Sequence, residues 1–177
     1  SEVEELLRRI RELSKRSKDE IKRMLKEIRE LSEKSKRDIE RMLRRNEDLA
    51  RKIKELIDRD NNDELVKRLN EESEKLAREA RKRVERSIRE IERLLEEIRR
   101  RVEESLRTLK EVLKEVEKNG VTEEIKREVE KLLEENRKLL EDLEEDVKRL
   151  IEENKRALEE VERESKRLND ESRERTK

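Results

Sequence analysis

The apolar residues of this 177-residue chain recur at intervals of 18. In the first third, the positions of the apolar stripe and the serines within it form one set that is followed 18 residues later by a matching set. The first set is Ser14, Ser17, Ile21, Met24, Leu25, Ile28 and Leu31, and the second is Ser32, Ser35, Ile39, Met42, Leu43, Asn46 and Leu49. The same interval, called one repeat below, relates 84–98 to 102–116 and 129–143 to 147–161. This interval makes five turns of an unstrained α-helix, whereas a heptad repeat would impose a left-handed supercoil. The repeat therefore predicts long, nearly straight helices.

Two short segments interrupt the helical pattern. Residues 58–63 are rich in Asp and Asn, which favour turns and helix N-caps, with Asn61 or Asn62 as the cap. In the second segment, 119–122, Gly120 suits the left-handed residue after a helix end and Thr122 suits an N-cap. We also expect Val121 to pack on Val116.

These signals, with a capping box formed by Ser1 and Glu4, predict helices at about 2–58, 63–118 and 123–174. Each helix would be on the order of 80 Å long. The apolar stripe covers roughly 120° of each helix, as one helix of a small bundle requires. Because short loops force consecutive helices to run antiparallel, residues 1–177 are expected to form one all-α antiparallel three-helix bundle. Its handedness is left open, because both hands satisfy the same stripes.

Uncharged polar residues inside the stripe fall at matching levels on the three helices. With the loops centred near residues 61 and 120, residue 14 lies level with about 108 and with about 132. Three polar layers follow from this alignment: Ser14, Ser17, Ser105, Thr108 and Asn136; then Ser32, Ser35, Ser87 and Asn154; and last Asn46, Asn70, Ser73, Ser165, Asn169 and Ser172. Buried hydroxyls and amides are costly unless they are hydrogen-bonded, so we interpret the layers as structural hydrogen-bond networks. A binding pocket or polar relay is the alternative.

The composition excludes most enzymatic chemistry. The chain has no His, Cys, Trp, Tyr, Phe or Pro, and its stripe carries no Asp or Glu. A thiolate nucleophile, a His base, a zinc–sulfur site and facing core carboxylates are therefore absent. We predict no catalytic residue, no cofactor and no metal.

The charge pattern and the missing aromatic residues also weigh against nucleic-acid and membrane partners. Lys and Arg total 52, as do Asp and Glu, and no apolar run approaches the roughly 18 residues of a membrane span. We expect a soluble chain without a targeting signal; its location cannot be read from the sequence. Residues 1–60, 61–120 and 121–177 carry +4, +1 and −5, which weakly favours pairing of the first and third helices.

The regular repeat, the matched Ser and Asn layers, the surface of Glu, Lys and Arg, and the Asn-Gly-Val-Thr loop resemble de novo designed helical bundles with buried hydrogen-bond networks. The resemblance covers the whole chain and implies a structural scaffold without a natural substrate, and no required partner. The alternative is an interaction module that associates with itself or receives a partner helix as part of a split bundle. A spectrin-like repeat would show core aromatics and a heptad period.

Overall fold

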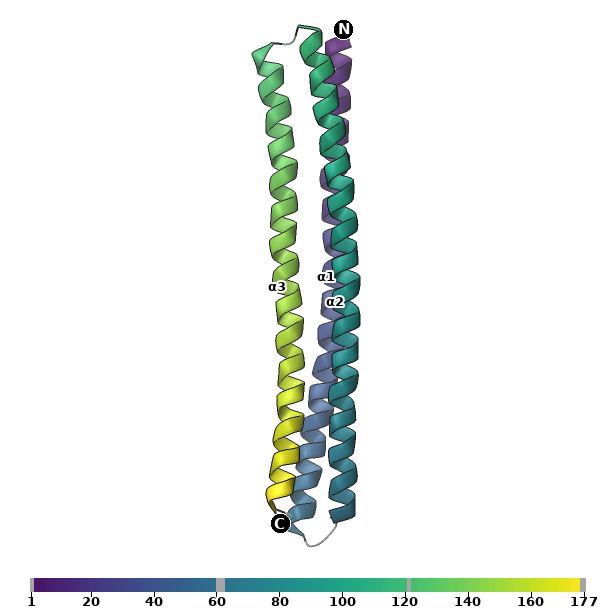
Figure 1. Ribbon diagram of the computed structural model, residues 1–177, viewed down its shortest axis with the longest axis vertical. Coiled ribbons are helices and arrows are strands. Elements are labelled where there is room, and N and C mark those ends of the chain that lie inside the picture. Colours follow the sequence, from purple (N-terminus) through teal and green to yellow (C-terminus); the bar gives the residue numbers. More distant parts are fainter. Residues whose placement is uncertain (1, 60–62, 121, 176–177) are drawn as a thin grey trace. The chain divides into compact units, whose positions relative to one another are not determined.

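The computed structural model describes residues 2–59, 63–120 and 122–175, and within them every regular element is a helix. The order along the chain is α1 (Glu2–Asp58), α2 (Asp63–Lys118) and α3 (Glu123–Arg175), as Figure 1 shows. These bounds agree with the ranges expected from the loop signals to within one residue. The expected roles of Ser1, Asn61, Asn62 and Val121 fall outside the described residues.

The end of α2 has the features that the sequence predicts. Gly120 adopts a φ of 77°, the left-handed conformation that a residue with a Cβ avoids. The amide of Asn119 donates to the carbonyl of Val116 at 3.1 Å, and the amide of Gly120 donates to Glu117 at 3.4 Å. At the start of α3, the carbonyl of Thr122 accepts from the amide of Lys126 at 3.3 Å, as an N-cap carbonyl does.

The contacts of the chain group into two compact units, each built from one segment of every helix. Unit 1 combines α1 up to Arg29 with Ile91–Arg149, and unit 2 combines Glu30–Glu90 with α3 from Leu150 onward. The organisation of residues 1–177 as a single domain stays a prediction, as does the straightness of the helices.

The core of unit 1 is aliphatic and takes side chains from all three helices. Ile10 of α1, Leu109 and Val116 of α2, and Val129 of α3 are fully buried in one cluster, which Leu133 joins. The start of α1 lies at the same end of this unit as the connection between α2 and α3 (Figure 1). The apolar face predicted for each helix is therefore the face buried in this unit.

Unit 2 has a second core of the same kind. Ile39 and Met42 of α1, Ala80 and Val84 of α2, and Leu158 and Val161 of α3 form its buried cluster. Met42 is core filler here, with 8% of its surface exposed.

Ion pairs within unit 2 show the direction of its helices. Asp38 of α1 pairs with Arg83 of α2, and Arg45, further along α1, pairs with Glu72, earlier on α2. The two segments therefore run antiparallel. In both units, α1–α3 pairs join residues 117 positions apart, as in Arg11–Glu128 of unit 1 and Lys36–Glu153 of unit 2. α1 and α3 therefore run parallel within each unit.

Within the described ranges, no helix is both long and apolar enough to cross a membrane.

Candidate functional site: the buried polar layers

In unit 1, the predicted first layer is centred on Asn136 of α3. This side chain is fully buried, and its Nδ2 donates to the hydroxyl of Ser14 on α1 at 2.8 Å. The same nitrogen donates to the carbonyl of Leu132, one turn earlier on its own helix, at 2.8 Å. Ser17 is also buried, and Ser105 of α2 is half-buried. The amide thus satisfies both of its donor hydrogens and ties α3 to α1.

Unit 2 repeats this arrangement in its own layer. Asn154 of α3 is fully buried, and its Nδ2 donates to Ser32 of α1 at 2.8 Å and to the carbonyl of Leu150 at 2.8 Å. Ser35 is buried and Ser87 of α2 is half-buried. Each of these residues lies one repeat away from its equivalent in unit 1. The hydrogen bonds therefore recur with the same interval as the sequence.

Several polar atoms of these two layers have no hydrogen-bond partner among the described residues. They are the amide oxygens of Asn136 and Asn154 and the hydroxyls of Ser17, Ser35 and Ser87. Each hydroxyl can donate and each amide oxygen can accept, so the layers retain unused hydrogen-bonding capacity. The predicted residues of these two layers, Thr108 excepted, are buried or half-buried, and among the described residues only the Asn–Ser pair of each layer is joined by a hydrogen bond across helices.

The third polar layer occupies positions that hold apolar residues in the other repeats. Ile10, Leu109 and Val129 of unit 1 are fully buried, and so are their equivalents one repeat away in the same unit, Ile28, Ile91 and Val147. At the next repeat, in unit 2, the corresponding residues are Asn46, Ser73 and Ser165, and all three are again buried. The hydroxyl of Ser73 donates to that of Ser165 at 3.2 Å. Neither the Nδ2 nor the Oδ1 of Asn46 has a partner in the described part of the chain, although the side chain is fully buried.

The remaining third-layer residues lie on α2 and α3 towards the start of α2. The hydroxyl of Ser172 donates to the carbonyl of Leu168 at 2.8 Å and lies 3.4 Å from the Oδ1 of Asn70. Asn169, half-buried, donates to the carboxylate of Glu74 at 2.8 Å. Sequence reasoning missed Glu74, because a charged residue at the edge of the stripe looks like an ordinary surface residue.

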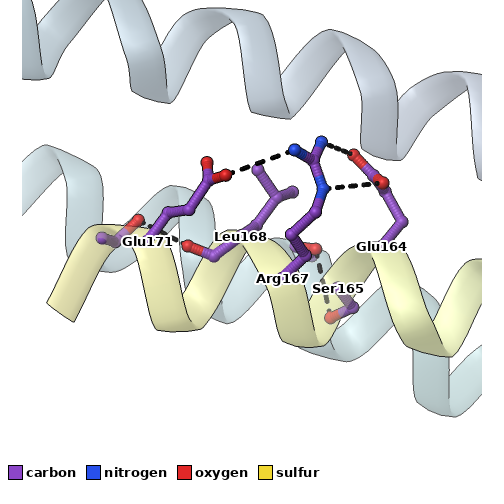
Figure 2. A network of polar contacts seen from close by, with 7 residues as sticks. Glu164, Ser165, Arg167, Leu168 and Glu171 are labelled. Carbon is purple, nitrogen blue, oxygen red and sulfur yellow. Dashed lines mark hydrogen bonds and ion pairs between the residues drawn. The ribbon is translucent and has the colours of Figure 1, made fainter. Parts of the chain in front are cut away.

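Figure 2 shows the same part of α3 and separates its two kinds of polar contact. Arg167 lies between Glu164 and Glu171, with Nη2 at 2.6 Å and Nη1 at 3.3 Å from their carboxylates. Ser165 projects from another side of the helix, where it meets Ser73. Exposed ion pairs such as those of Arg167 contribute little to stability. Of the two kinds of contact, the buried hydrogen bond between Ser73 and Ser165 is therefore the one that belongs to the polar layer.

Thr108 lies outside the first layer. The structure places its side chain on the exposed surface of α2, where the hydroxyl donates to the carbonyl of Glu104 in the same helix at 3.0 Å. The sequence repeat would have excluded Thr108 from the layer, because the equivalent position one repeat earlier is the charged residue Glu90. Ser105, on the preceding turn, is the α2 member of the layer that faces inward.

A second repeated feature, which sequence reasoning missed, is a row of ion pairs between α1 and α3. In unit 1, Lys18 pairs with Glu135, and the hydrogen bond from this lysine lowers the pKa of the Glu135 carboxyl. In unit 2, the hydrogen bond with Glu153 raises the pKa of Lys36. The two pairs are related by one repeat on both helices. The opposite net charges of residues 1–60 and 121–177 predicted that α1 pairs with α3, but they did not identify which residues form the pairs.

The layers offer hydroxyl and amide groups in an aliphatic setting. Among the described residues, no group of three or more acidic side chains is placed to hold a metal ion. Neutral hydroxyls and amides without an adjacent base can position one another, but they supply neither an activated nucleophile nor a proton acceptor near neutral pH.

Comparison with known proteins fits this arrangement. No protein-family model matches the chain, and no curated protein matches it. A solved structure described as a "Computationally designed three helix bundle" is similar in fold, with a TM-score of 0.50 and 18% sequence identity. The match covers 98% of this chain and 82% of that one. The chain has the three-helix-bundle fold. At this level of identity, the likeness concerns the fold alone.

Proposed function

We propose that the chain is a designed structural scaffold without a natural biochemical activity. On this proposal, the aliphatic cores supply the stability, and the buried Ser and Asn layers determine which register of the helices is adopted. The similar structure is itself described as computationally designed, which supports the first part of the proposal.

The observation that carries the proposal is the Asn–Ser hydrogen bond between α3 and α1, which occurs at 2.8 Å in each unit. If α3 slid by one turn towards the start of α1, Asn136 and Asn154 would come level with Ile10 and Ile28 in place of Ser14 and Ser32. An unpaired buried amide costs about 1–3 kcal/mol, so a register shifted in this direction is penalised in each unit. An apolar core alone has no such preference, because aliphatic side chains interact without direction.

Substituting both asparagines tests this role. In the Asn136→Leu/Asn154→Leu variant, we expect the free energy of unfolding to stay equal or rise, because well-packed apolar groups replace buried polar ones at little cost. We also expect the single set of amide resonances in a ¹H–¹⁵N spectrum to be lost, or species of higher mass to appear. Thr108→Leu, a polar-to-leucine change at an exposed position of α2, is the matched control and should change neither property.

If the double variant keeps one set of resonances and the parent mass, whatever its free energy of unfolding, the layers do not specify the register. The scaffold proposal would then lose the observation on which it rests.

The alternative is an interaction module that completes its core with a second copy or a partner helix. Such an interface needs apolar surface, and among the described residues the large hydrophobic side chain that stands exposed is Leu65, at 41%. Light scattering across a wide concentration range separates the scaffold from a module that associates with a second copy. A constant mass of 21.8 kDa supports the scaffold, and a mass that rises with concentration supports the interaction module.

A further inference from the structure

The connection between α2 and α3 contains an asparagine that is followed by glycine. Asn119 precedes Gly120, the single glycine of the chain, and both residues are exposed to solvent. An asparagine side chain reaches the backbone amides next to it, so its carbonyl carbon, Cγ, can approach the nitrogen of the following residue. A glycine at that following position has no Cβ to hinder the approach. Asn119 therefore meets the steric requirement for a reaction with its own backbone.

The structure leaves both reacting groups free to move. Asn119 lies just beyond Lys118, the last residue of α2, so the helix does not fix the torsion that turns its backbone towards Gly120. The amide nitrogen of Gly120 donates to the carbonyl of Glu117 at 3.4 Å, which is long for a hydrogen bond of this kind. A Cβ added at Gly120 would meet no atom within 4 Å, so no neighbouring side chain crowds this residue. The nitrogen is therefore released at little cost.

The other asparagines in the described ranges lie inside helices and are followed by residues that have a Cβ. They are Asn46, Asn70, Asn136, Asn154 and Asn169. Inside an α-helix, the following amide nitrogen is held by its own hydrogen bond and the backbone torsions are fixed. Asn136 and Asn154 are also fully buried and hydrogen-bonded to serines. These asparagines are unreactive comparisons within the same chain.

We propose that Asn119 is a site of spontaneous covalent modification in the folded protein. Hydroxide removes the proton from the backbone nitrogen of Gly120, and this nitrogen forms a bond with Cγ of Asn119. The bond between Cγ and Nδ2 breaks, and Nδ2 takes a proton from water and leaves as ammonia. The product is a cyclic imide, a succinimide. Water then opens the imide: addition at Cγ gives aspartate, and addition at the backbone carbonyl carbon gives isoaspartate, in which the chain runs through the former side chain.

Both products change the end of α2. Each places a negative charge at the negative end of the helix dipole, where an anion is unfavourable. Isoaspartate also lengthens the backbone before Gly120 by one methylene group, which displaces its amide from Glu117. Val116, one turn earlier, is fully buried in the core cluster of unit 1, so the change stays local to the connection. The modification is independent of the proposed scaffold role, because the polar layers contain neither Asn119 nor Gly120.

The test incubates the protein in neutral and in mildly alkaline buffer, folded and in denaturing urea. A glutamyl endopeptidase in mildly acidic buffer then releases residues 118–123, and electron-transfer fragmentation tells isoaspartate from aspartate. In the folded protein, we expect first-order conversion of Asn119, faster in alkaline buffer, at a rate within about tenfold of the rate in urea. Asn70 and Asn136 should be unchanged over the same period. Asn61, which lies outside the described residues, should react more slowly than Asn119.

Two variants separate this reaction from general ageing of the sample. Gly120→Ala should slow the conversion at least about tenfold, folded or in urea, because the added Cβ hinders the attack. Asn119→Gln should abolish it at this position, because glutamine must close a larger ring. The proposal is overturned if folded Asn119 reacts more than about tenfold more slowly than in urea, since the turn would then protect it. It is also overturned if Gly120→Ala leaves the rate unchanged.

Discussion

The Nδ2 of Asn154 lies 2.8 Å from the Oγ of Ser32, and one repeat earlier on both helices Asn136 and Ser14 form the same bond at the same distance. Both pairs join residues 122 positions apart. One register between α1 and α3 therefore serves both units, each of which contains one copy of the hydrogen bond.

These two bonds should be equal in their effect on stability. Ser14→Ala and Ser32→Ala each remove the acceptor of one buried hydrogen bond, so each should lower the free energy of unfolding by about 1 kcal/mol. The two losses should add, because the sites share no partner. Urea denaturation of the single and double variants measures this. Ser35→Ala is the control, since its buried hydroxyl is unpaired among the described residues, and it should be neutral or slightly stabilising. A larger loss for Ser35→Ala than for Ser32→Ala would contradict the assignment of partners.

Asn46→Ile should stabilise the protein by about 2 kcal/mol. Asn46 is fully buried with neither amide atom paired among the described residues, and its equivalents Ile10 and Ile28 show that isoleucine fits this position. The substitution removes a desolvated amide and buries an aliphatic side chain. The reverse change at the equivalent position, Ile28→Asn, should destabilise by about 3 kcal/mol. Thermal and chemical denaturation measure both changes, and a loss of stability in Asn46→Ile would mean that the amide has a partner in solution.

Gly120→Ala should lower the free energy of unfolding by about 1 kcal/mol. A Cβ at this position meets no atom within 4 Å, so the cost arises from the backbone φ of 77° and not from a clash. Gly120→Asn should cost less, because asparagine tolerates the left-handed conformation better than alanine. Equal losses of stability in Gly120→Ala and Gly120→Asn would mean that the backbone conformation at this position is not the cause of the loss.

The Lys18–Glu135 pair should give the protein a small acid sensitivity. Because Lys18 lowers the pKa of Glu135 in the folded state from its ordinary value of 4.5, the stabilisation is complete above that value. It is lost as the pH falls through the lower pKa of the folded state. Since the pair is partly exposed to solvent, the effect should be about 0.5 kcal/mol or less.

Glu135→Gln should therefore be less stable than the parent at neutral pH and equal to it in strong acid. Denaturation curves at both pH values, with Glu130→Gln at an exposed position of α3 as control, measure the difference. A gap between parent and Glu135→Gln that widens on acidification would contradict the direction of the pKa shift.

Much of the fold follows from local signals. The end of α2 and the start of α3 were predictable because Gly120 and Thr122 act through their own backbone. The burial of Asn136 and Asn154 was predictable because the repeat places them on the apolar face. Thr108 shows the limit of alignment by level alone, since height along a helix does not say which way a side chain faces.

The sequence by itself determined the helical period, the limits of the helices and the levels at which polar residues enter the core. These depend on spacing along one chain segment at a time. Only the tertiary structure decided that Asn154 bonds Ser32 while Ser35 is left unpaired, that Asn46 has no partner among the described residues, and that Asn169 reaches Glu74. Hydrogen bonds require separations of about 3 Å and defined angles. Those depend on the rotation of each helix about its axis and on side-chain torsions, which no repeat length encodes.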